Sequence, residues 1–331
     1  MITTVCGEIR GEQLGLCQMH EHILLRRGVP ASLNPALCAE EPEKSREEVR
    51  AFAEAGGNAV VDAQPIGCGR MPSELARIAV QTGVHIVAST GFHLRRFYAE
   101  EHWLFTLSER ELEELFCREL CEGMYENADV RLDGIVTDRR AGLIKTACEG
   151  DSLSETQRRL FTAAAFAARI CQVPLMIHTE PLSHPLALFN DLTGLGVPPE
   201  RMIFCHLDRA IPEESVAYQL CREGAYVEYD TIGRFKYHSD EKEIRLIGNL
   251  LERGFEKQLL LSLDTTRQRM LAYGGEIGLT YLLHRFLPAL RRAGVSEDVL
   301  RGILAENPRR VLERSASGKT EAIGQGRGEE E

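Results

Sequence analysis

The chain has 331 residues, 44% of them hydrophobic, which is enough to bury a large core within one domain. Its 39 Lys and Arg residues stand against 50 Asp and Glu residues, and the net charge of −11 excludes a general basic surface for nucleic acid or anionic lipid. The sequence shows neither a signal-peptide pattern nor an apolar run of membrane-spanning length. We therefore expect a cytoplasmic protein whose partner is a small molecule, with no role for membrane or nucleic acid.

The ten cysteines are scattered, without a CxxC pair or the spacing of a disulfide framework. In a chain of this size without secretory features, they are expected to be reduced and buried. Cys117 and Cys121 lie four residues apart on a predicted helix, so both thiols face one side. Such a pair could share a soft metal ion, but the sequence places no further ligand near them.

Apolar runs alternate with segments of helical spacing along most of the chain. Residues 1–9 and 12–16 are predicted to pair as a short hairpin that turns at Arg10-Gly11. The predicted buried strands are the segment that ends at residues 20–22, then 58–63, 85–90, 141–145, 174–178, 202–206, 225–229 and 258–264. The predicted helices are 45–56, 72–83, 108–127, 154–171, 184–195, 212–223, 241–253, 280–293 and 296–305.

Eight short strands that alternate with helices favour an α/β fold of the (β/α)8 TIM-barrel type, with a single domain over residues 1–314. The alternative is a doubly wound open sheet, but its usual Gly-rich first turn is not found in the sequence. Residues 315–331 contain Gly, Ser and charged residues without an apolar period, so a disordered tail is predicted there. Apolar outer faces of the helices fit either a homodimer interface or ordinary surface.

His20 and His22 are the first candidate metal ligands. Side chains alternate along a strand, so both imidazoles are expected on one face while Glu21 points away. Barrels build active sites at the carboxyl ends of their strands, and four further polar residues stand at these ends: Lys145, His178, His206 and Asp264. Four imidazoles and a carboxylate suit zinc, manganese or cobalt better than calcium.

Lys145 does not resemble an ordinary metal ligand, because an ammonium group repels cations. Burial in an apolar strand favours the neutral amine, which can capture carbon dioxide. The resulting carbamate, N6-carboxylysine, is anionic and can bridge two metal ions. We hypothesise that Lys145 is modified in this way.

These residues and the motifs around them resemble the phosphotriesterase-like branch of the amidohydrolase superfamily. The likeness runs over nearly the whole chain and rests on an ordered set of His-x-His, Lys, His, His and Asp on successive predicted strands. It extends through residues 177–180, 205–209 and 263–264 to Glu306-Asn307-Pro308. The resemblance implies a TIM barrel with a binuclear metal centre. In that centre a hydroxide and carboxylated Lys145 bridge two ions, one held by His20, His22 and Asp264 and the other by His178 and His206.

The chemistry expected of such a centre is metal-dependent hydrolysis, with zinc as the simplest choice of metal. Asp264 is expected to accept the proton of the attacking hydroxide and to pass it to the leaving oxygen. We favour an enzyme that opens a lactone, with a phosphorylated sugar lactone as the sharper prediction, and any phosphotriester hydrolysis would be a side activity. The alternatives are a phosphotriesterase, a hydrolase of another ester or of an amide, a deaminase, and a non-catalytic metal-containing binding protein.

Substrate contacts are expected in the loops at the same end of the barrel. The loops after the seventh and eighth strands often bind phosphate, so Lys236 and Arg267 are candidate anchors for an anion. The loop after the third strand supplies Phe92, His93 and Tyr98. This loop and residues 264–268 are similar to a subgroup that acts on phosphorylated sugar lactones, although Met270 stands where that subgroup has a tyrosine.

Overall fold

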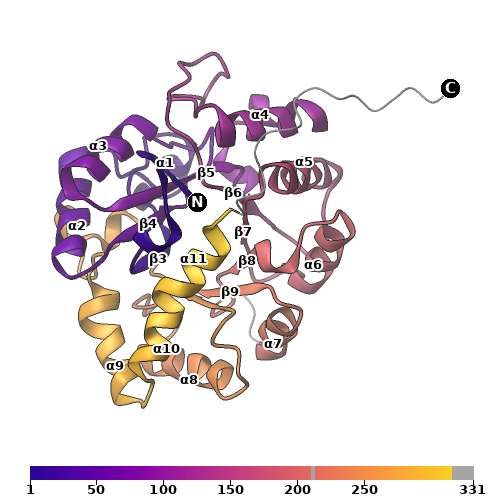
Figure 1. Ribbon diagram of the computed structural model, residues 1–331. Coiled ribbons are helices and arrows are strands. Elements are labelled where there is room, and N and C mark those ends of the chain that lie inside the picture. The colour runs from indigo at the N-terminus through magenta and orange to yellow at the C-terminus, as the bar shows by residue number, and fades with distance from the viewer. Residues whose placement is uncertain (210–212, 315–331) are drawn as a thin grey trace.

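The computed structural model describes residues 1–209 and 213–314, and its centre is a barrel of eight parallel strands surrounded by helices (Figure 1). Each strand pairs with the next one along the chain. The barrel strands are β3 (Cys17–Glu21), β4 (Ala59–Asp62), β5 (His85–Gly91), β6 (Leu143–Ala147), β7 (Leu175–His178), β8 (Met202–Cys205), β9 (Tyr226–Tyr229) and β10 (Leu259–Leu261). The TIM-barrel prediction is confirmed, whereas the tail predicted at 315–331 lies outside the described residues.

The barrel closes between its first and last strands. Glu21 and Thr265 form a parallel bridge, and the His22 N–H donates to the Thr265 carbonyl over 3.1 Å. One step along, the Asp264 N–H donates to the His20 carbonyl over 3.0 Å. The two ends of the sequence therefore meet at the point where His20 and Asp264 present their side chains.

Glu21 supports this seam with its side chain. Its carboxylate accepts hydrogen bonds from the Ser262 hydroxyl and from the Thr265 N–H, each over 2.8 Å. Glu21 is fully buried, and its side chain faces β10 and not the side of the strand from which His20 projects, as the alternation of the strand predicts.

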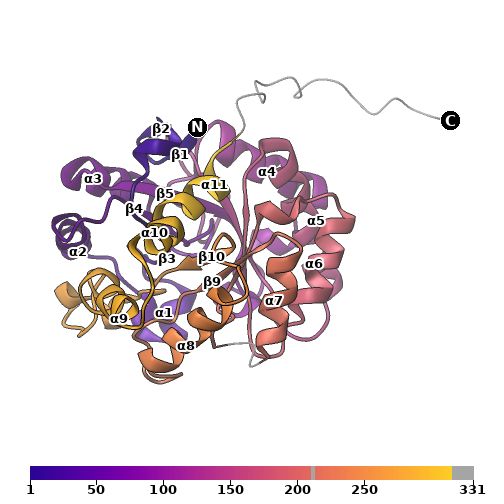
Figure 2. The ribbon, with the colours of Figure 1, turned by 60° about the horizontal axis from the view of Figure 1, so that its bottom comes forward.

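Helices connect successive strands and cover the outside of the barrel (Figure 2). They are α1 (Val29–Leu33), α2 (Pro42–Glu54), α3 (Pro72–Thr82), α4 (Glu109–Cys121), α5 (Glu155–Cys171), α6 (Pro185–Gly194), α7 (Glu214–Arg222), α8 (Asp240–Leu251), α9 (Leu287–Arg292), α10 (Glu297–Arg301) and α11 (Asn307–Leu312). Two π-helical turns, Leu282–Phe286 and Gly302–Glu306, lead into α9 and α11. The helices predicted at 280–293 and 296–305 thus correspond to composite helices in which π-helical turns join α-helical ones.

Apolar side chains fill the barrel. They also seal the end of the barrel opposite His20 and Asp264, and we call this end the floor. The interior cluster contains Met19, Val61, Met176 and Ile203, and it continues to Val311 on α11. Figure 1 shows α11 lying across this end, close to the N-terminus. A packed interior leaves the opposite end, the mouth, as the place where polar side chains from the strands can meet.

The N-terminal hairpin differs from the prediction. It lies within residues 2–9, where β1 (Ile2–Thr4) pairs antiparallel with β2 (Gly7–Ile9). The predicted turn at Arg10-Gly11 is wrong, and residues 12–16 do not form the second strand, because Gly11–Gln13 is a 3-10 turn. Gly7, with φ of 113°, and the Thr4 hydroxyl, which accepts from the Cys6 N–H, make the tight turn earlier in the chain.

Helix α4 is shorter than the predicted helix 108–127. Its start is as predicted, since Ser108 and Glu111 form a reciprocal capping box. The helix ends at Cys121 because the loop returns against it: a Cβ on Gly123 would lie 1.8 Å from the Thr137 carbonyl oxygen. The close approach of Gly123 to the Thr137 carbonyl oxygen requires glycine. The segment after Cys121 is therefore a loop, where the prediction had further helical turns.

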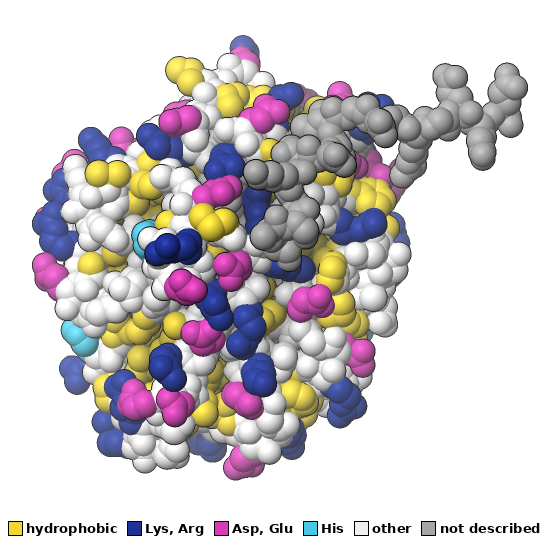
Figure 3. Space-filling model, in the orientation of Figure 1, with side chains coloured by type: hydrophobic (Ala, Val, Ile, Leu, Met, Phe, Trp, Pro, Cys, Tyr) yellow, Lys and Arg dark blue, Asp and Glu magenta, His cyan; other side chains and the backbone are white. Residues whose placement is uncertain are grey.

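Acidic and basic side chains are interspersed over the face shown in Figure 3, so no extended basic field lies on it. Within the described ranges, no helix combines the length and apolar character needed to cross a bilayer.

Candidate metal centre

Four polar side chains converge at the mouth of the barrel. His20, His22 and Asp264 bring their ligand atoms within 4.8 Å of one another. The Nε2 atoms of His20 and His22 lie 4.0 and 3.4 Å from Asp264 Oδ1. Lys145 reaches the same point from β6, where its Nζ lies 2.8 Å from His20 Nε2. All four residues are buried.

His178 and His206 complete the cluster from the next two strands. His206 Nε2 lies 2.8 Å from His178 Nδ1, and the two ring centroids are 4.4 Å apart. The ring of His206 is in turn 4.9 Å from that of His20. The structure therefore brings together all six residues that the sequence placed at the strand ends, and we call these six residues the histidine cluster.

Backbone geometry at three positions lets the strands present these groups. His206 and Asp264 adopt left-handed φ angles of 63° and 49°, which non-glycine residues rarely do. Such conformations persist where surrounding structure enforces them, and they are typical of functional sites. Gly91 has φ of 98°, and a Cβ there would lie 2.0 Å from the Lys145 carbonyl oxygen, so only glycine allows β5 to approach β6 at this point.

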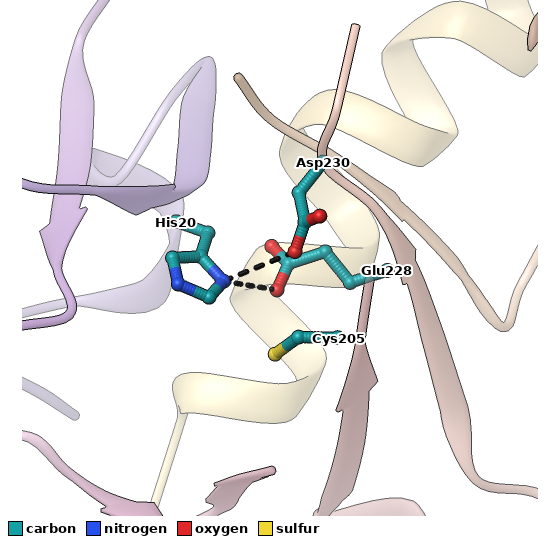
Figure 4. Close-up of side chains that lie close together, drawn as sticks. All are labelled: His20, Cys205, Glu228 and Asp230. Carbon is teal, nitrogen blue, oxygen red and sulfur yellow. Dashed lines mark hydrogen bonds and ion pairs between the residues drawn. The ribbon is translucent and has the colours of Figure 1, made fainter. Parts of the chain in front are cut away.

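Two buried carboxylates, Glu228 and Asp230, stand behind the cluster, and Figure 4 shows both of them facing the His20 ring. His20 Nδ1 lies 3.2 Å from Glu228 Oε2 and 3.1 Å from Asp230 Oδ2. Asp230 Oδ1 also lies 2.6 Å from His206 Nδ1. Glu228 and Asp230 are alternate residues of one strand and its continuation, so both face the same way. Such partners fix the ring orientation and aim Nε2 at the cluster.

Glu228 and Asp230 were not predicted from the sequence. The signal was available, because a glutamate inside a run predicted as a buried strand needs a polar partner. The other two rings are also held by side chains: Gln64 Oε1 lies 2.8 Å from His22 Nδ1, and Glu180 Oε1 lies 2.8 Å from His178 Nε2.

The environment keeps the imidazoles neutral. Burial lowers the pKa of His20 to about 4 and that of His178 to about 3, and the nearby Lys145 acts in the same direction. Burial and the neighbouring His178 also hold the pKa of His206 well below its usual value. Neutral imidazole is the form that binds metal ions.

Asp264 behaves in the opposite way to an isolated buried carboxyl. Burial alone would raise its pKa, but Arg234 and the adjacent histidines outweigh burial and hold that pKa well below the usual value. Arg234 Nη2 lies 2.9 Å from Asp264 Oδ2. An ionised carboxylate beside several neutral imidazoles is a donor set that fits divalent cations such as zinc.

A cavity of about 230 Å³ opens above the cluster. His22, His178 and Asp264 form part of its base. Its wall carries four cationic side chains, namely Arg96, Arg209, Arg234 and Lys236. Two of the residues predicted as substrate contacts, Lys236 and His93, are therefore at the cavity, and the ring centroid of His93 lies 4.8 Å from that of His178.

Phe92 and Tyr98 lie near this cavity without lining it, as far as the described residues show. Phe92 is buried and packs edge-on against Phe161, with ring centroids 5.2 Å apart. The Tyr98 hydroxyl accepts a hydrogen bond from the His93 N–H over 2.8 Å. Tyr98 thus supports the loop that presents His93.

Arg267 also lies apart from the cavity above the histidine cluster. It lines a neighbouring cavity with Asn34 and Tyr273, and its guanidinium carbon is 5.8 Å from the centre of the Tyr273 ring. Arg267 was predicted as an anchor because it lies in the loop after the last strand. The cations that the structure adds at the cavity, Arg209 and Arg234, lie after β8 and β9.

A second buried group lies beside the mouth, and we call it the acidic triad: Asp208, His238 and Glu243. His238 Nε2 lies 3.0 Å from Glu243 Oε2 and 4.0 Å from Asp208 Oδ2. Asp208 Oδ2 also accepts hydrogen bonds from the Thr231 N–H and hydroxyl over 2.7 and 2.6 Å. His238 therefore pairs with carboxylates between α8 and the strands, and it is not among the residues that line the cavity described above.

The barrel and the histidine cluster together define a class of TIM-barrel protein with metal-binding groups at the carboxyl ends of the strands. The model of the phosphotriesterase family matches residues 1–312, and the chain belongs to that family.

Similar proteins are found among curated sequences and among solved structures. The chain is 30% identical to a phospho-furanose lactonase from Mycoplasmopsis synoviae (strain 53), over 93% of this chain and 90% of that protein. It is 26% identical to an N-acetyltaurine hydrolase from Danio rerio, over 94% of this chain and 97% of that protein. The crystal structure of a lactonase from Listeria monocytogenes superimposes with a TM-score of 0.85 at 26% identity, covering 94% of this chain and 98% of the other.

Proposed function

We propose that this protein is a metal-dependent lactonase that hydrolyses the ring ester of a lactone bearing an acidic group. The observation that carries the proposal is the histidine cluster at the base of a cavity with cationic walls. The likeness to a phospho-furanose lactonase over 93% of the chain supports the same reaction.

The donor set fits two divalent ions, with zinc preferred and manganese or cobalt as alternatives. His20, His22 and Asp264 would hold one ion, and His178 and His206 would hold the other. Lys145, carboxylated on Nζ, would stand between them. When bound, the ions supply an activated water nucleophile and polarise the carbonyl that it attacks.

We propose that Asp264 transfers the proton from the attacking water to the leaving oxygen. Its low pKa keeps the carboxylate ionised at neutral pH, so it can accept a proton from the attacking water. The same carboxyl group then delivers this proton to the ring oxygen, which leaves as an alcohol when the ester bond breaks. Arg234, 2.9 Å from Oδ2, holds the carboxylate in place at the base of the cavity.

The acidic group of the substrate would bind to Arg209 and Lys236. The charge of Arg96 is offset by Glu149 and Glu180, at 3.6 and 3.4 Å. Burial alone would lower the pKa of Arg209, but the charges of Asp264, Asp230 and Glu180 outweigh burial and raise that pKa. Arg209 and Lys236 both flank the ring of Tyr237, at 5.1 and 4.6 Å from its centre. Arg209 and Lys236 therefore lie close together at the cavity, and such a pair of cationic side chains suits a phosphate or another compact anion.

The test uses matched pairs of five-carbon sugar lactones with and without a terminal phosphate. The protein is loaded with zinc or manganese in bicarbonate, and the bound metal is quantified before turnover is measured. We expect a clear preference for the phosphorylated member. Lys236→Ala should reduce that preference mainly through a higher KM, because an anchor distant from the reacting bond contributes binding.

Lys242→Ala is the matched control, since Lys242 is also exposed but lies on α8 away from the cavity-lining residues. Arg267→Ala tests the anchor chosen from sequence and should change KM less than Lys236→Ala. Equal turnover of both lactones would support the lactonase reaction but exclude a cationic anchor for the acidic group of the substrate. If metal-loaded protein opened none of the lactones, the proposed reaction would be wrong.

Amide hydrolysis is the second candidate, because 94% of this chain also aligns with an N-acetyltaurine hydrolase. The same cavity could place an N-acyl carbonyl over the cluster and an acidic group on its cationic wall. Measuring N-acetylated amino acids and amino sulfonates beside the lactones separates the two reactions. Turnover of an N-acetyl compound well above every lactone would replace the lactonase assignment.

A further inference from the structure

The acidic triad lies beside the cationic wall of the cavity. None of its residues, Asp208, His238 and Glu243, is among the described residues that line the cavity. Asp208 immediately precedes Arg209 in the loop after β8, and His238 follows Lys236 closely in the loop after β9. The triad therefore contacts the two loops that carry the proposed anion anchor, Arg209 and Lys236.

The loop after β9 is buried at both ends and exposed in the middle. Thr231 at its start and His238 at its end are buried. Between them, Phe235 and Tyr237 are 59% and 41% exposed, and Lys236 is exposed as well. The exposed part of the loop thus carries the cation, and its position depends on how the two buried ends are held.

Asp208 joins the loop after β8 to the start of the loop after β9. Its Oδ2 atom accepts hydrogen bonds from the N–H and the hydroxyl of Thr231, over 2.7 and 2.6 Å. Both are good hydrogen-bond distances, and together they fix the backbone and the side chain of Thr231. Because this contact lies next to Arg209 in the chain, it fixes the separation of the two loops at the anchor.

His238 closes the loop after β9 on itself. Its Nε2 atom lies 3.1 Å from the Thr231 hydroxyl, so the two ends of the segment 231–238 meet. The same Nε2 atom lies 3.0 Å from Oε2 of Glu243 on α8. Joining the ends restricts the residues between them, and the contact with a packed helix fixes the direction in which they project.

A separate contact holds the first half of the same loop. The Gly233 N–H donates to Asp240 Oδ1 over 3.1 Å, and Asp240 Oδ2 accepts from the Tyr281 hydroxyl over 2.7 Å. Gly233 also lies close to Tyr281, since a Cβ there would be 3.1 Å from the ring. The distinct contribution of the triad is therefore at the second half of the loop, where Lys236 lies.

The triad does not hold these loops in the most stable way. Asp208 Oδ1 and Glu243 Oε1 are buried and make no hydrogen bond to another described residue. Buried polar atoms without partners destabilise a fold, and apolar side chains of similar volume often replace buried charged groups without loss. Two buried carboxyl groups at this place thus favour a role in the site over a purely structural one.

We propose that the acidic triad is the positioning group of the anion anchor, because it fixes the loops that carry Arg209 and Lys236 relative to each other. The triad takes no part in breaking the ester bond. It determines the affinity for the acidic group of the substrate, whereas the histidine cluster determines how fast the bond breaks. This inference rests on the proposed function, because the anchor is part of that proposal.

Thr231→Val is the main variant, because it keeps the shape of the side chain and removes the hydroxyl that contacts Asp208 and His238. Zinc-loaded protein is assayed with the lactones that differ only in a terminal phosphate. We expect KM of the phosphorylated lactone to rise by about 2- to 10-fold, the range for one lost hydrogen bond. Its kcat, and KM of the other lactone, should stay as in wild type.

Thr3→Val is the matched control, because Thr3 is a buried threonine of β1 and belongs to neither loop. It should leave all four kinetic constants unchanged. Glu243→Gln should act in the same direction as Thr231→Val, since it weakens the contact with His238. Circular dichroism verifies the fold of each variant.

Combining Thr231→Val with Lys236→Ala separates positioning from a general effect. If the hydroxyl acts through the anchor, its removal should raise KM less in the Lys236→Ala background than in wild type, because the positioned group has gone. Hydrogen exchange of residues 231–239 should be faster in Thr231→Val, since the ends of the loop are then held less tightly. Additive effects on KM would mean that the triad does not act through Lys236.

Binding of a ribose that bears a terminal phosphate tests the anchor without the reaction. Calorimetry on zinc-loaded protein should show a weaker Kd in Thr231→Val, by about the same factor as KM. If no lactone is opened but this Kd still shifts, the proposed reaction is wrong and the positioning role stands. An equal fall in kcat on both lactones would overturn that role, as would an unchanged Kd and KM in both triad variants. If wild type does not bind the ribose phosphate, the anchor and its positioning group are both excluded.

Discussion

The histidine cluster and the acidic triad lie near each other at the mouth of the barrel, yet the pKa values of their buried groups shift in opposite directions. In the histidine cluster, burial lowers the pKa of His178 to about 3. In the triad, burial raises the pKa of Glu243 to about 8, and the carboxylate of Asp208 acts in the same direction. Burial alone would lower the pKa of His238, but the adjacent Glu243 raises it. The two groups therefore differ in whether imidazoles or carboxylates predominate.

This difference indicates which group is prepared for a cation. Neutral imidazoles with an ionised Asp264 offer lone pairs toward an open cavity. In the triad, the pKa values of the Asp208 and Glu243 carboxyl groups are raised, and Glu243 Oε2 lies 3.0 Å from His238 Nε2, while buried oxygens of both carboxyl groups make no hydrogen bond to another described residue. Burial of ionisable groups alone thus does not define a metal centre, because the ratio of imidazole to carboxylate and access to a cavity also decide it.

Lys145→Ala should have the largest effect. Without the bridging carbamate, we expect loss of most of the bound metal and of hydrolysis, with part of both restored by formate or acetate. Metal content by elemental analysis and turnover with the added acids measure this. If Lys145→Ala retained two ions as tightly as wild type without an added carboxylate, the bridging role would be excluded.

Asp264→Asn should rank second. The amide keeps an oxygen at the base of the cavity but cannot accept a proton, so turnover should fall by roughly 10²- to 10⁴-fold, the range for loss of a general base. Steady-state kinetics on protein of verified metal content measure the loss. Asp191→Asn, an exposed position on α6, is the matched control. Turnover within a few-fold of wild type would exclude Asp264 as the proton acceptor.

Glu228→Gln should have an intermediate effect. The amide is nearly the same shape, but it no longer offers a carboxylate to His20 Nδ1, so metal affinity should fall by about 10- to 100-fold, as for other partners of metal-binding histidines. Competition with a chelator measures the affinity. Glu243→Gln removes a buried carboxylate of the triad and should leave metal affinity unchanged. An equal loss in both variants would mean that the effect is a general loss of packing.

The pH dependence of stability should show a smaller effect, and its sign should differ between the two groups. The folded protein lowers the pKa of His20 and His178 from 6.5, so their contribution to stability is present above pH 6.5 and is lost as the pH falls toward 4. Urea unfolding of chelator-treated protein at pH 6.5 and pH 4 measures this loss. Metal-free His178→Asn should lose less stability over that interval, and an equal loss would exclude the histidine as its cause.

The triad should act in the opposite direction. The folded protein raises the pKa of Glu243 from 4.5 to about 8, so its stabilising contribution is present below pH 4.5 and is lost as the pH rises toward 8. Glu243→Gln should remove this slope, even if its stability is lower at every pH. The measurement is urea unfolding of variant and wild type at several values between pH 4.5 and 8. Parallel pH profiles would show that Glu243 does not titrate in this range.

The strand ends and the histidine cluster were predictable because they depend on local periodicity. His20 and His22 follow the alternation of a strand, and His178 and His206 each end or follow an apolar run. Once the runs are placed on a barrel, their carboxyl ends must meet. Each of these four positions in the histidine cluster therefore follows from a short-range sequence pattern together with the rule that the strand ends meet.

The cavity wall was less predictable because loops carry no such periodicity. Lys236 and Arg267 were chosen by their place after the last two strands, yet only Lys236 lines the cavity above the histidine cluster. Phe92, predicted to contact substrate, packs edge-on against Phe161 and lines a neighbouring cavity rather than the one above the histidine cluster. Which way a loop side chain points depends on tertiary contacts that the sequence pattern does not contain.

The seam between β3 and β10 has a consequence for synthesis of the protein. His20 leaves the ribosome early and Asp264 late, and the hydrogen bond from the Asp264 N–H to the His20 carbonyl forms only when the last strand docks. If the histidine cluster binds an ion as proposed, a nascent chain that has not yet released residue 264 would lack one side of that site. Metal uptake would then require the completed barrel, and a truncated chain would be expected to fail to keep the ion.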